Sequence, residues 1–282
     1  SNTNSIIYYP KKINYIITNM IITIIIIIPI ILILLYRNQL LLKPSFYRYI
    51  YNVHHKMFKV KTNSIFGWSY TNRLLFLISY LMSVRKPNRK EQNILNKKME
   101  KVNSLMQKNN KIKFLISNNL EMNMPFTLSN YIVIDQHKIK SISIETLVHE
   151  TIHIIQRKNQ KKFDEFYKSY YPFIHESFPI EKLPKQLKEK YMTNPDSNFD
   201  IWTYKINNKI YIPILEYNEG QLTENLYLQK DINTTPIKIS LLLHYDNYVS
   251  LYHPNEIFAC EMAHQIMNDN VHYKMKEFFK KI

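Results

Sequence analysis

Two histidines and a glutamate are grouped in one short segment, His149-Glu150-Thr151-Ile152-His153. Side chains four residues apart lie one turn apart on the same face of a helix, so both imidazoles can reach one metal ion. Imidazole is a common ligand of zinc, and water bound to zinc loses a proton near neutral pH. The spacing therefore predicts a site for one Zn²⁺ ion on His149 and His153, with Glu150 as the general base that takes the proton from water.

This chemistry requires a helix at the motif, and the surrounding residues have the pattern of one. Apolar residues recur at helical spacing over residues 142–157, and a strand-like apolar run at residues 131–134 precedes them. We therefore expect a strand, a turn and then the helix that carries the motif.

A catalytic zinc ion usually has three protein ligands and one position open to water. Residues 156–160 follow the motif directly and contain no histidine, so the third ligand must come from farther along the chain. Segment 253–264 offers the best candidate, because Pro254 is a favourable first helical residue and Glu256 then shares a face with a stripe of small residues. We expect Glu256 to be the third ligand. The alternatives in this segment are Glu261, His253 and His264.

The pairing of His149-Glu150-x-x-His153 with Asn255-Glu256 and Ala259 resembles the gluzincin branch of the zincin metallopeptidases, which includes thermolysin-like enzymes. The wider pattern over residues 112–268 is similar to predicted zincins of large DNA viruses. Its looser matches lie at residues 124–127, 131–134, 146–150, 156–157, 194–196 and 253–256. The resemblance implies an α+β zincin-like fold, Glu256 as a zinc ligand, and a peptide or protein substrate.

The chain departs from the thermolysin-like pattern at one position. Those enzymes carry an acid four residues after the ligand glutamate, where it supports a zinc-bound histidine, whereas this chain has Cys260. The hydrogen-bond partners of the histidines must therefore differ. The candidates are Cys260, Asp196 and Glu145.

A group that stabilises the developing oxyanion is also expected. Tyr252, close to Glu256 in the sequence, is our choice. The other candidates are Tyr248, His253 and His264. By analogy with zincins, the strand at residues 131–134 is either the sheet edge that pairs with an extended peptide or a plain core strand.

An uncharged apolar run at residues 15–36 predicts a single-pass transmembrane helix, since a helix of that length rises about 33 Å. No small-residue cleavage site follows it, which argues against a signal peptide. Basic residues are more numerous after the run than before it, which favours a cytosolic location for the rest of the chain. The lone cysteine, Cys260, fits a reducing compartment. The membrane could belong to a cell, a virion or a viral factory.

Composition narrows the remaining classes of function. The chain has only 2 glycines, which excludes a glycine-rich phosphate cradle. Its formal net charge of +16 is spread along the sequence without an arginine-rich run or a nucleic-acid-binding signature, so nucleic acid is not an expected partner.

These patterns predict three regions. They are an N-terminal tail with the transmembrane helix at residues 1–36, a mostly helical membrane-proximal segment at 37–90, and a zincin-like catalytic domain at 91–282. Helices are predicted at 74–84, after Pro87, at 237–246 and at 254–268, and strands at 112–117, 201–206 and 209–215. Residues 158–200 are predicted to form a polar, proline-interrupted stretch without regular structure. The C-terminus is predicted to be a basic tail.

The expected function is that of a membrane-anchored zinc endopeptidase. One alternative is a catalytically silent zincin-fold protein with a structural role, for example in a virion membrane. The other is a nucleic-acid-associated membrane protein that uses its positive charge.

Overall fold

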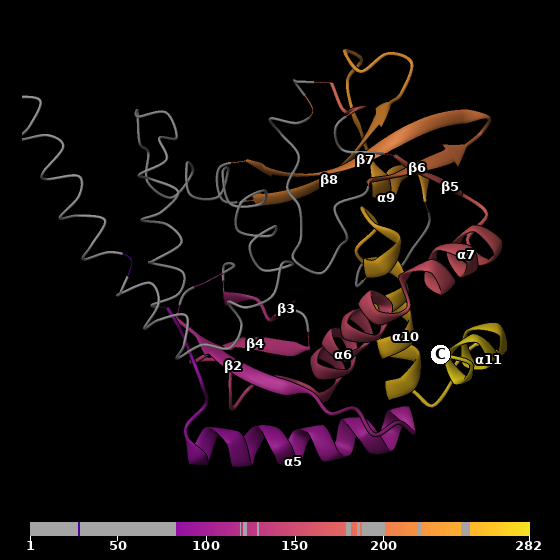
Figure 1. The fold of residues 1–282 in the computed structure, drawn as a ribbon. Helices are drawn as coiled ribbons and strands as arrows, with labels where there is room; N and C mark the ends of the chain where they lie inside the picture. Colours follow the sequence, from indigo (N-terminus) through magenta and orange to yellow (C-terminus); the bar gives the residue numbers. More distant parts are fainter. Residues whose placement is uncertain are drawn as a thin grey trace, which may run out of the picture.

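A computed structural model describes residue 28 and residues 83–118, 120, 123–128, 130–178, 182–184, 187, 201–218, 221–243 and 249–282. Apart from residue 28, the predicted transmembrane helix at residues 15–36 lies outside these residues, as does nearly all of the predicted helix at 74–84. Among the helices that the structure describes, none combines the length and apolar composition needed to cross a bilayer. The described part is a mixed α+β fold, with helices lying between and beside two β-sheets (Figure 1).

The first sheet has four strands in the order β1-β2-β4-β3. The strands are β1 (Val84–Arg85), β2 (Lys113–Ser117), β3 (Phe126–Leu128) and β4 (Tyr131–Asp135). β2 and β4 are parallel, and the other two pairings are antiparallel. β4 is buried along its whole length between β2 and β3, so the interpretation of residues 131–134 as the sheet edge is wrong. β3 forms that edge instead.

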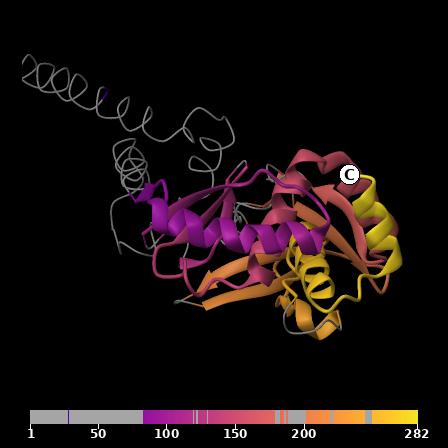
Figure 2. The same cartoon turned by 90° about the horizontal axis from the view of Figure 1, so that it is seen from below.

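Helix α5 (Arg89–Met106) lies beneath this sheet (Figures 1 and 2). Asn88 and Glu91 form a reciprocal capping box at its start, and Arg85 holds Glu91 with two side-chain hydrogen bonds of 2.6 Å. The prediction of an amphipathic helix after Pro87 is confirmed. Its buried face carries Leu95, Met99, Val102 and Met106.

Two helices run between the two sheets and contribute to the central core (Figure 1). α6 (Ile144–Lys158) begins at Ser143, whose hydroxyl accepts a hydrogen bond from the Thr146 backbone N–H. α10 (Pro254–Met267) begins after His253 with a proline at its first position. Both helices were predicted, α6 from its apolar spacing and α10 from Pro254, and they pack directly on one another.

The second sheet has five antiparallel strands in the order β5-β6-β7-β8-β9. The strands are β5 (Ile174–Phe178), β6 (Ile201–Ile206), β7 (Lys209–Asn218), β8 (Gln221–Leu228) and β9 (Ile237–Lys238). β6 and β7 were predicted, whereas β5 and β8 were not. The helix predicted over residues 237–246 is confirmed only in part: α9 (Ile239–Leu242) is a single helical turn, and the two residues before it form β9.

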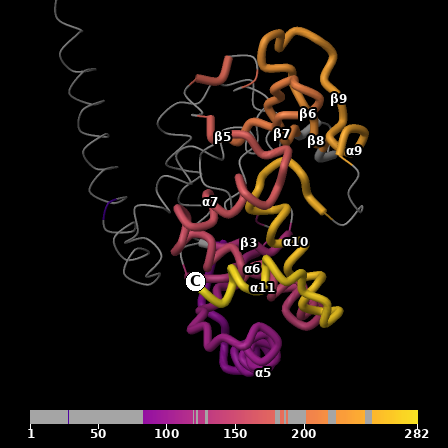
Figure 3. The backbone as a smooth tube through the Cα atoms, turned by 90° about the vertical axis from the view of Figure 1, so that its right-hand side faces the viewer, coloured from indigo at the N-terminus to yellow at the C-terminus, as the bar shows by residue number. Residues whose placement is uncertain are grey.

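Two more helices replace segments that were predicted to be irregular. α7 (Gln160–Tyr170) buries Phe163 and Tyr167 within the stretch read as polar. α11 (Tyr273–Lys280) forms where a basic tail was expected, because Met275 and Phe279 are buried. The Phe278 ring stacks on Phe166 with centroids 4.2 Å apart, so α11 packs against α7 (Figure 3). Aromatic packing thus outweighs the polar composition of both segments.

Candidate metal centre

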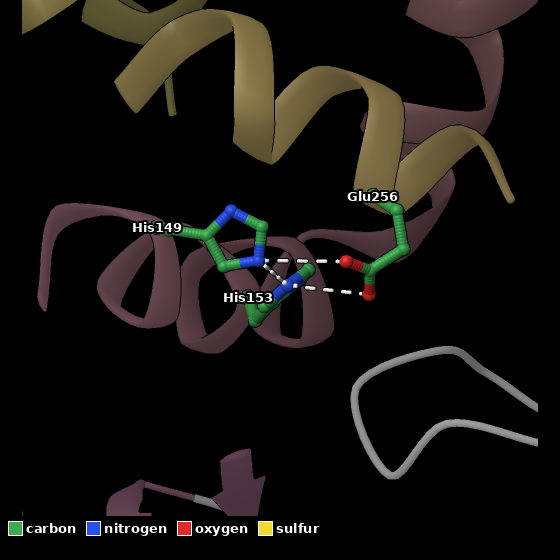
Figure 4. A group of neighbouring side chains, drawn as sticks. All are labelled: His149, His153 and Glu256. Carbon is green, nitrogen blue, oxygen red and sulfur yellow. Dashed lines mark hydrogen bonds and ion pairs between the residues drawn. The ribbon is translucent and has the colours of Figure 1, made fainter. Parts of the chain in front are cut away.

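The three predicted metal ligands converge where α6 and α10 meet (Figure 4). His149 Nε2 lies 3.4 Å from one carboxylate oxygen of Glu256, and His153 Nε2 lies 3.3 Å from the other. The two Nε2 atoms are 2.8 Å apart. His153 and Glu256 are buried, while the His149 side chain keeps 20% of its surface exposed. The group therefore reaches solvent beside His149.

This donor set fits a zinc ion. Two imidazole nitrogens and a carboxylate are the ligands found in many catalytic zinc sites. A tetrahedral ion with bonds of about 2.0–2.1 Å would separate neighbouring ligand atoms by ~3.3 Å. The two distances to Glu256 match that value, and the separation of the nitrogens is somewhat shorter. The buried His149, His153 and Glu256 group could hold one metal ion.

The start of α10 explains why Glu256 can lie there as a buried carboxylate. His253 caps the helix, because its Nδ1 accepts a hydrogen bond of 3.1 Å from the backbone N–H of Asn255. Glu256 follows in the first turn, where the positive end of the helix dipole favours an anion. His253 therefore acts as a helix cap, and it is not in the metal-binding group.

The charges of the three ligands stabilise one another. Burial alone would raise the pKa of Glu256, but the charge of His153 and hydrogen bonds from both histidines hold that pKa far below its usual range. Burial would lower the pKa of His149, but hydrogen bonds with Cys260 and Glu256 raise it well above its ordinary value. The Glu256 carboxylate is thus ionised beside the two histidines.

A buried hydrogen-bond network holds the ring of His153. Its Nδ1 lies 2.7 Å from Oε1 of Gln156, one turn farther along α6. The Gln156 side-chain amide donates to the hydroxyl of Tyr167 and to the backbone carbonyl of Asn255, each at 2.9 Å. The Tyr167 hydroxyl donates in turn to Oδ1 of Asn255. These bonds orient the Gln156 oxygen toward His153, so that His153 donates from Nδ1 and presents Nε2 to the metal centre.

The two helices are antiparallel, and their facing residues form a ladder. His153 faces Glu256, His149 shares a side-chain hydrogen bond with Cys260, and Glu145 forms an ion pair of 3.5 Å with His264. Cys260 thus contacts a predicted zinc-bound histidine, at the position where thermolysin-like enzymes carry an acid. Glu145 and His264 form the exposed pair at the end of this ladder, and neither belongs to the group of three candidate metal ligands.

The second sheet positions the segment that leads into α10. Glu224 of β8 accepts hydrogen bonds from the Ser250 hydroxyl and from the Leu251 backbone N–H. Tyr204 of β6 donates its hydroxyl proton to the Leu251 carbonyl at 2.7 Å. The long segment between His153 and Glu256 therefore helps to fix the third ligand.

The other candidate residues have different outcomes. Glu150 is buried and 4% exposed, and its charge acts on His149. Tyr252 is buried four residues before Glu256, and its role as oxyanion stabiliser stays a prediction. Glu261, an alternative third ligand, accepts a hydrogen bond from the Tyr171 hydroxyl instead. Asp196 and Tyr248 lie outside the described residues.

Sequence reasoning missed Gln156, Tyr167 and Asn255. Gln156 carried a usable signal, because it lies three residues after His153 and so on the same helix face. Tyr167 carried none, since it reaches the centre only through the packing of α7 against α10. Comparisons with known protein families, curated proteins and solved structures find no match to this chain.

Proposed function

We propose that this chain is a zinc-dependent metallopeptidase of the gluzincin type, anchored in a membrane through residues 15–36. The observation that carries the proposal is the convergence of His149, His153 and Glu256 on one point, with Glu150 beside the first histidine. This donor set is found in catalytic zinc sites that keep one position for water. The remaining exposure of His149 supplies a route by which water and substrate can reach the centre.

The proposed reaction is hydrolysis of a peptide bond. Zinc would supply a Lewis acid and lower the pKa of a bound water. Glu150 would take a proton from the attacking water and deliver it to the leaving amine as the peptide bond breaks. His149, His153 and Glu256 would hold the ion, and Gln156 and Cys260 orient the two histidines.

Zinc analysis tests the metal centre. The full chain, purified in detergent, is expected to bind one equivalent of zinc, and His153→Ala is expected to lose it. His137→Ala is the matched control, because His137 is exposed and lies in the turn after β4. Zinc that is kept by His153→Ala, or lost equally by His137→Ala, would refute the proposed ligand set.

Proteolysis tests the chemistry on the same preparations. Wild type should cleave casein or members of a peptide library in a chelator-sensitive way. Glu150→Gln should keep its zinc and lose activity by about 10²–10⁴-fold. Glu145→Gln on the same helix is the control, since Glu145 pairs with His264 at the exposed rung. One equivalent of zinc without any chelator-sensitive cleavage would instead favour the structural, catalytically silent alternative.

A further inference from the structure

A second concave site lies at the far end of α10 from the metal centre. It is a cavity of about 360 Å³ between the C-terminal end of α5, the last turns of α10, and α11. Ligand pockets in proteins commonly occupy about 300–1,000 Å³, so this cavity suits a small ligand. α10 contributes Met262 and Ile266 to it, at least six residues beyond Glu256. The cavity is therefore a site apart from the metal group.

The floor of the cavity is apolar. Met106, Met262, Ile266 and Phe279 line it, and each is at most 7% exposed. Val271 and Leu105 extend the apolar lining, and Leu105 is 37% exposed. A ligand that fills this space must carry an aliphatic or aromatic body, because its burial against these side chains supplies the main favourable free energy.

The rim carries an excess of positive charge. Lys108, Lys276 and Lys280 line the cavity against a single acid, Asp269. Lys280 is engaged by Glu277 at 2.9 Å, and the ammonium group of Lys108 lies 4.6 Å from the centre of the Phe279 ring. Lys108 thus lies over the apolar floor, and partial burial lowers its pKa. An anionic group beside Lys108 and Lys276 would restore favourable interactions to these cations.

We propose that this cavity binds a small amphiphilic anion, a medium-chain aliphatic carboxylate being the simplest example. The apolar floor takes the chain, and the lysine rim takes the carboxylate. A neutral or cationic amphiphile of the same length lacks the second interaction. The proposal does not depend on the zinc centre or on peptidase activity.

Photolabelling of the full chain in detergent tests this site. The probe is octanoic acid carrying a diazirine on its chain, and labelled peptides are mapped by mass spectrometry. Labels are expected on residues 105–108 and 262–271. Lys276→Glu should reduce the labelling by about fivefold or more, whereas Lys274→Glu, an equal charge reversal two residues away and outside the cavity, should change it less than about twofold. Val271→Trp should fill the cavity and so reduce the labelling.

Three results would overturn the proposal. The first is equal labelling by the corresponding diazirine alcohol, which would mean that the anion is not recognised. The second is equal loss in Lys276→Glu and Lys274→Glu, which would reflect general charge attraction. The third is labelling only at residues 15–36 or at the metal ligands, which would indicate partitioning into detergent or binding to zinc. Circular dichroism of each variant verifies that the helices are intact.

Discussion

Nδ1 of His153 lies 2.7 Å from Oε1 of Gln156, and both side chains come from one face of α6. Gln156 cannot turn its amide around without losing its bonds to Tyr167 and to the Asn255 carbonyl. The histidine is therefore held in the tautomer whose other nitrogen, Nε2, faces His149 and Glu256. A metal site depends on such partners almost as much as on its ligands.

Gln156→Leu should weaken zinc binding about 10–100-fold, because His153 loses the acceptor that fixes its tautomer. Tyr167→Phe should weaken it less, since it removes only the hydroxyl that holds Gln156. Competition with a chromophoric chelator measures both affinities. Gln160→Leu, the same substitution at the first residue of α7, is the control. An unchanged affinity in Gln156→Leu would show that the network does not position His153.

Glu224→Ala should lower the free energy of unfolding by about 1–3 kcal/mol, because the Leu251 N–H and the Ser250 hydroxyl lose their acceptor. The same change loosens the segment before α10 and should weaken zinc binding as well. Denaturant unfolding and zinc titration measure the two effects. Glu176→Ala on β5 is the exposed control. If the variant loses stability but keeps its zinc affinity, Glu224 does not help to position the metal ligands.

Zinc should stabilise the fold, because its ligands come from two helices that are brought together only in the folded chain. At a free zinc concentration 100 times the Kd, the gain is about 2.7 kcal/mol. Thermal unfolding with zinc and with excess chelator measures it. The difference should vanish in His153→Ala and persist in His137→Ala. A midpoint that does not respond to zinc in wild type would contradict coupling between binding and folding.

Glu261 should make stability depend on pH. Burial raises its pKa from 4.5 to about 7, with the hydrogen bond from Tyr171 opposing the shift. The folded chain then holds a proton that the unfolded chain releases, so this contribution is fully present below pH 4.5 and is lost as the pH rises to about 7. The full change is about 3 kcal/mol.

Urea unfolding across this pH range, with excess chelator in every sample, tests that dependence. Glu261→Gln keeps an acceptor for Tyr171 but cannot titrate, so its stability should fall less with rising pH than that of wild type. Because the metal ligands titrate in both proteins, their contribution cancels in the difference. Glu165→Gln, exposed on α7, should follow wild type. Parallel curves for wild type and Glu261→Gln would assign the pH dependence to other groups.

Local patterns allowed the elements around the motif to be predicted. Helical spacing of apolar residues identified α5 and α6, and Pro254 marked the start of α10. Short apolar runs identified β2, β4, β6 and β7. α7 and α11 were missed because their lysines and acids hid aromatic residues such as Phe163, Phe166 and Phe278, which pack on each other and on α10.

By itself, the sequence determined that His149 and His153 can share one metal, because their spacing is a property of any helix. It also supplied Glu256 as a candidate, without its position. Only the tertiary structure decided that Glu256 reaches those histidines, that Cys260 and Gln156 hold them, and that Glu224 fixes the approach to α10. Apart from the contact between His153 and Gln156 within α6, those relationships join residues far apart in the chain, and their geometry depends on how α6, α7, α10 and the second sheet pack together.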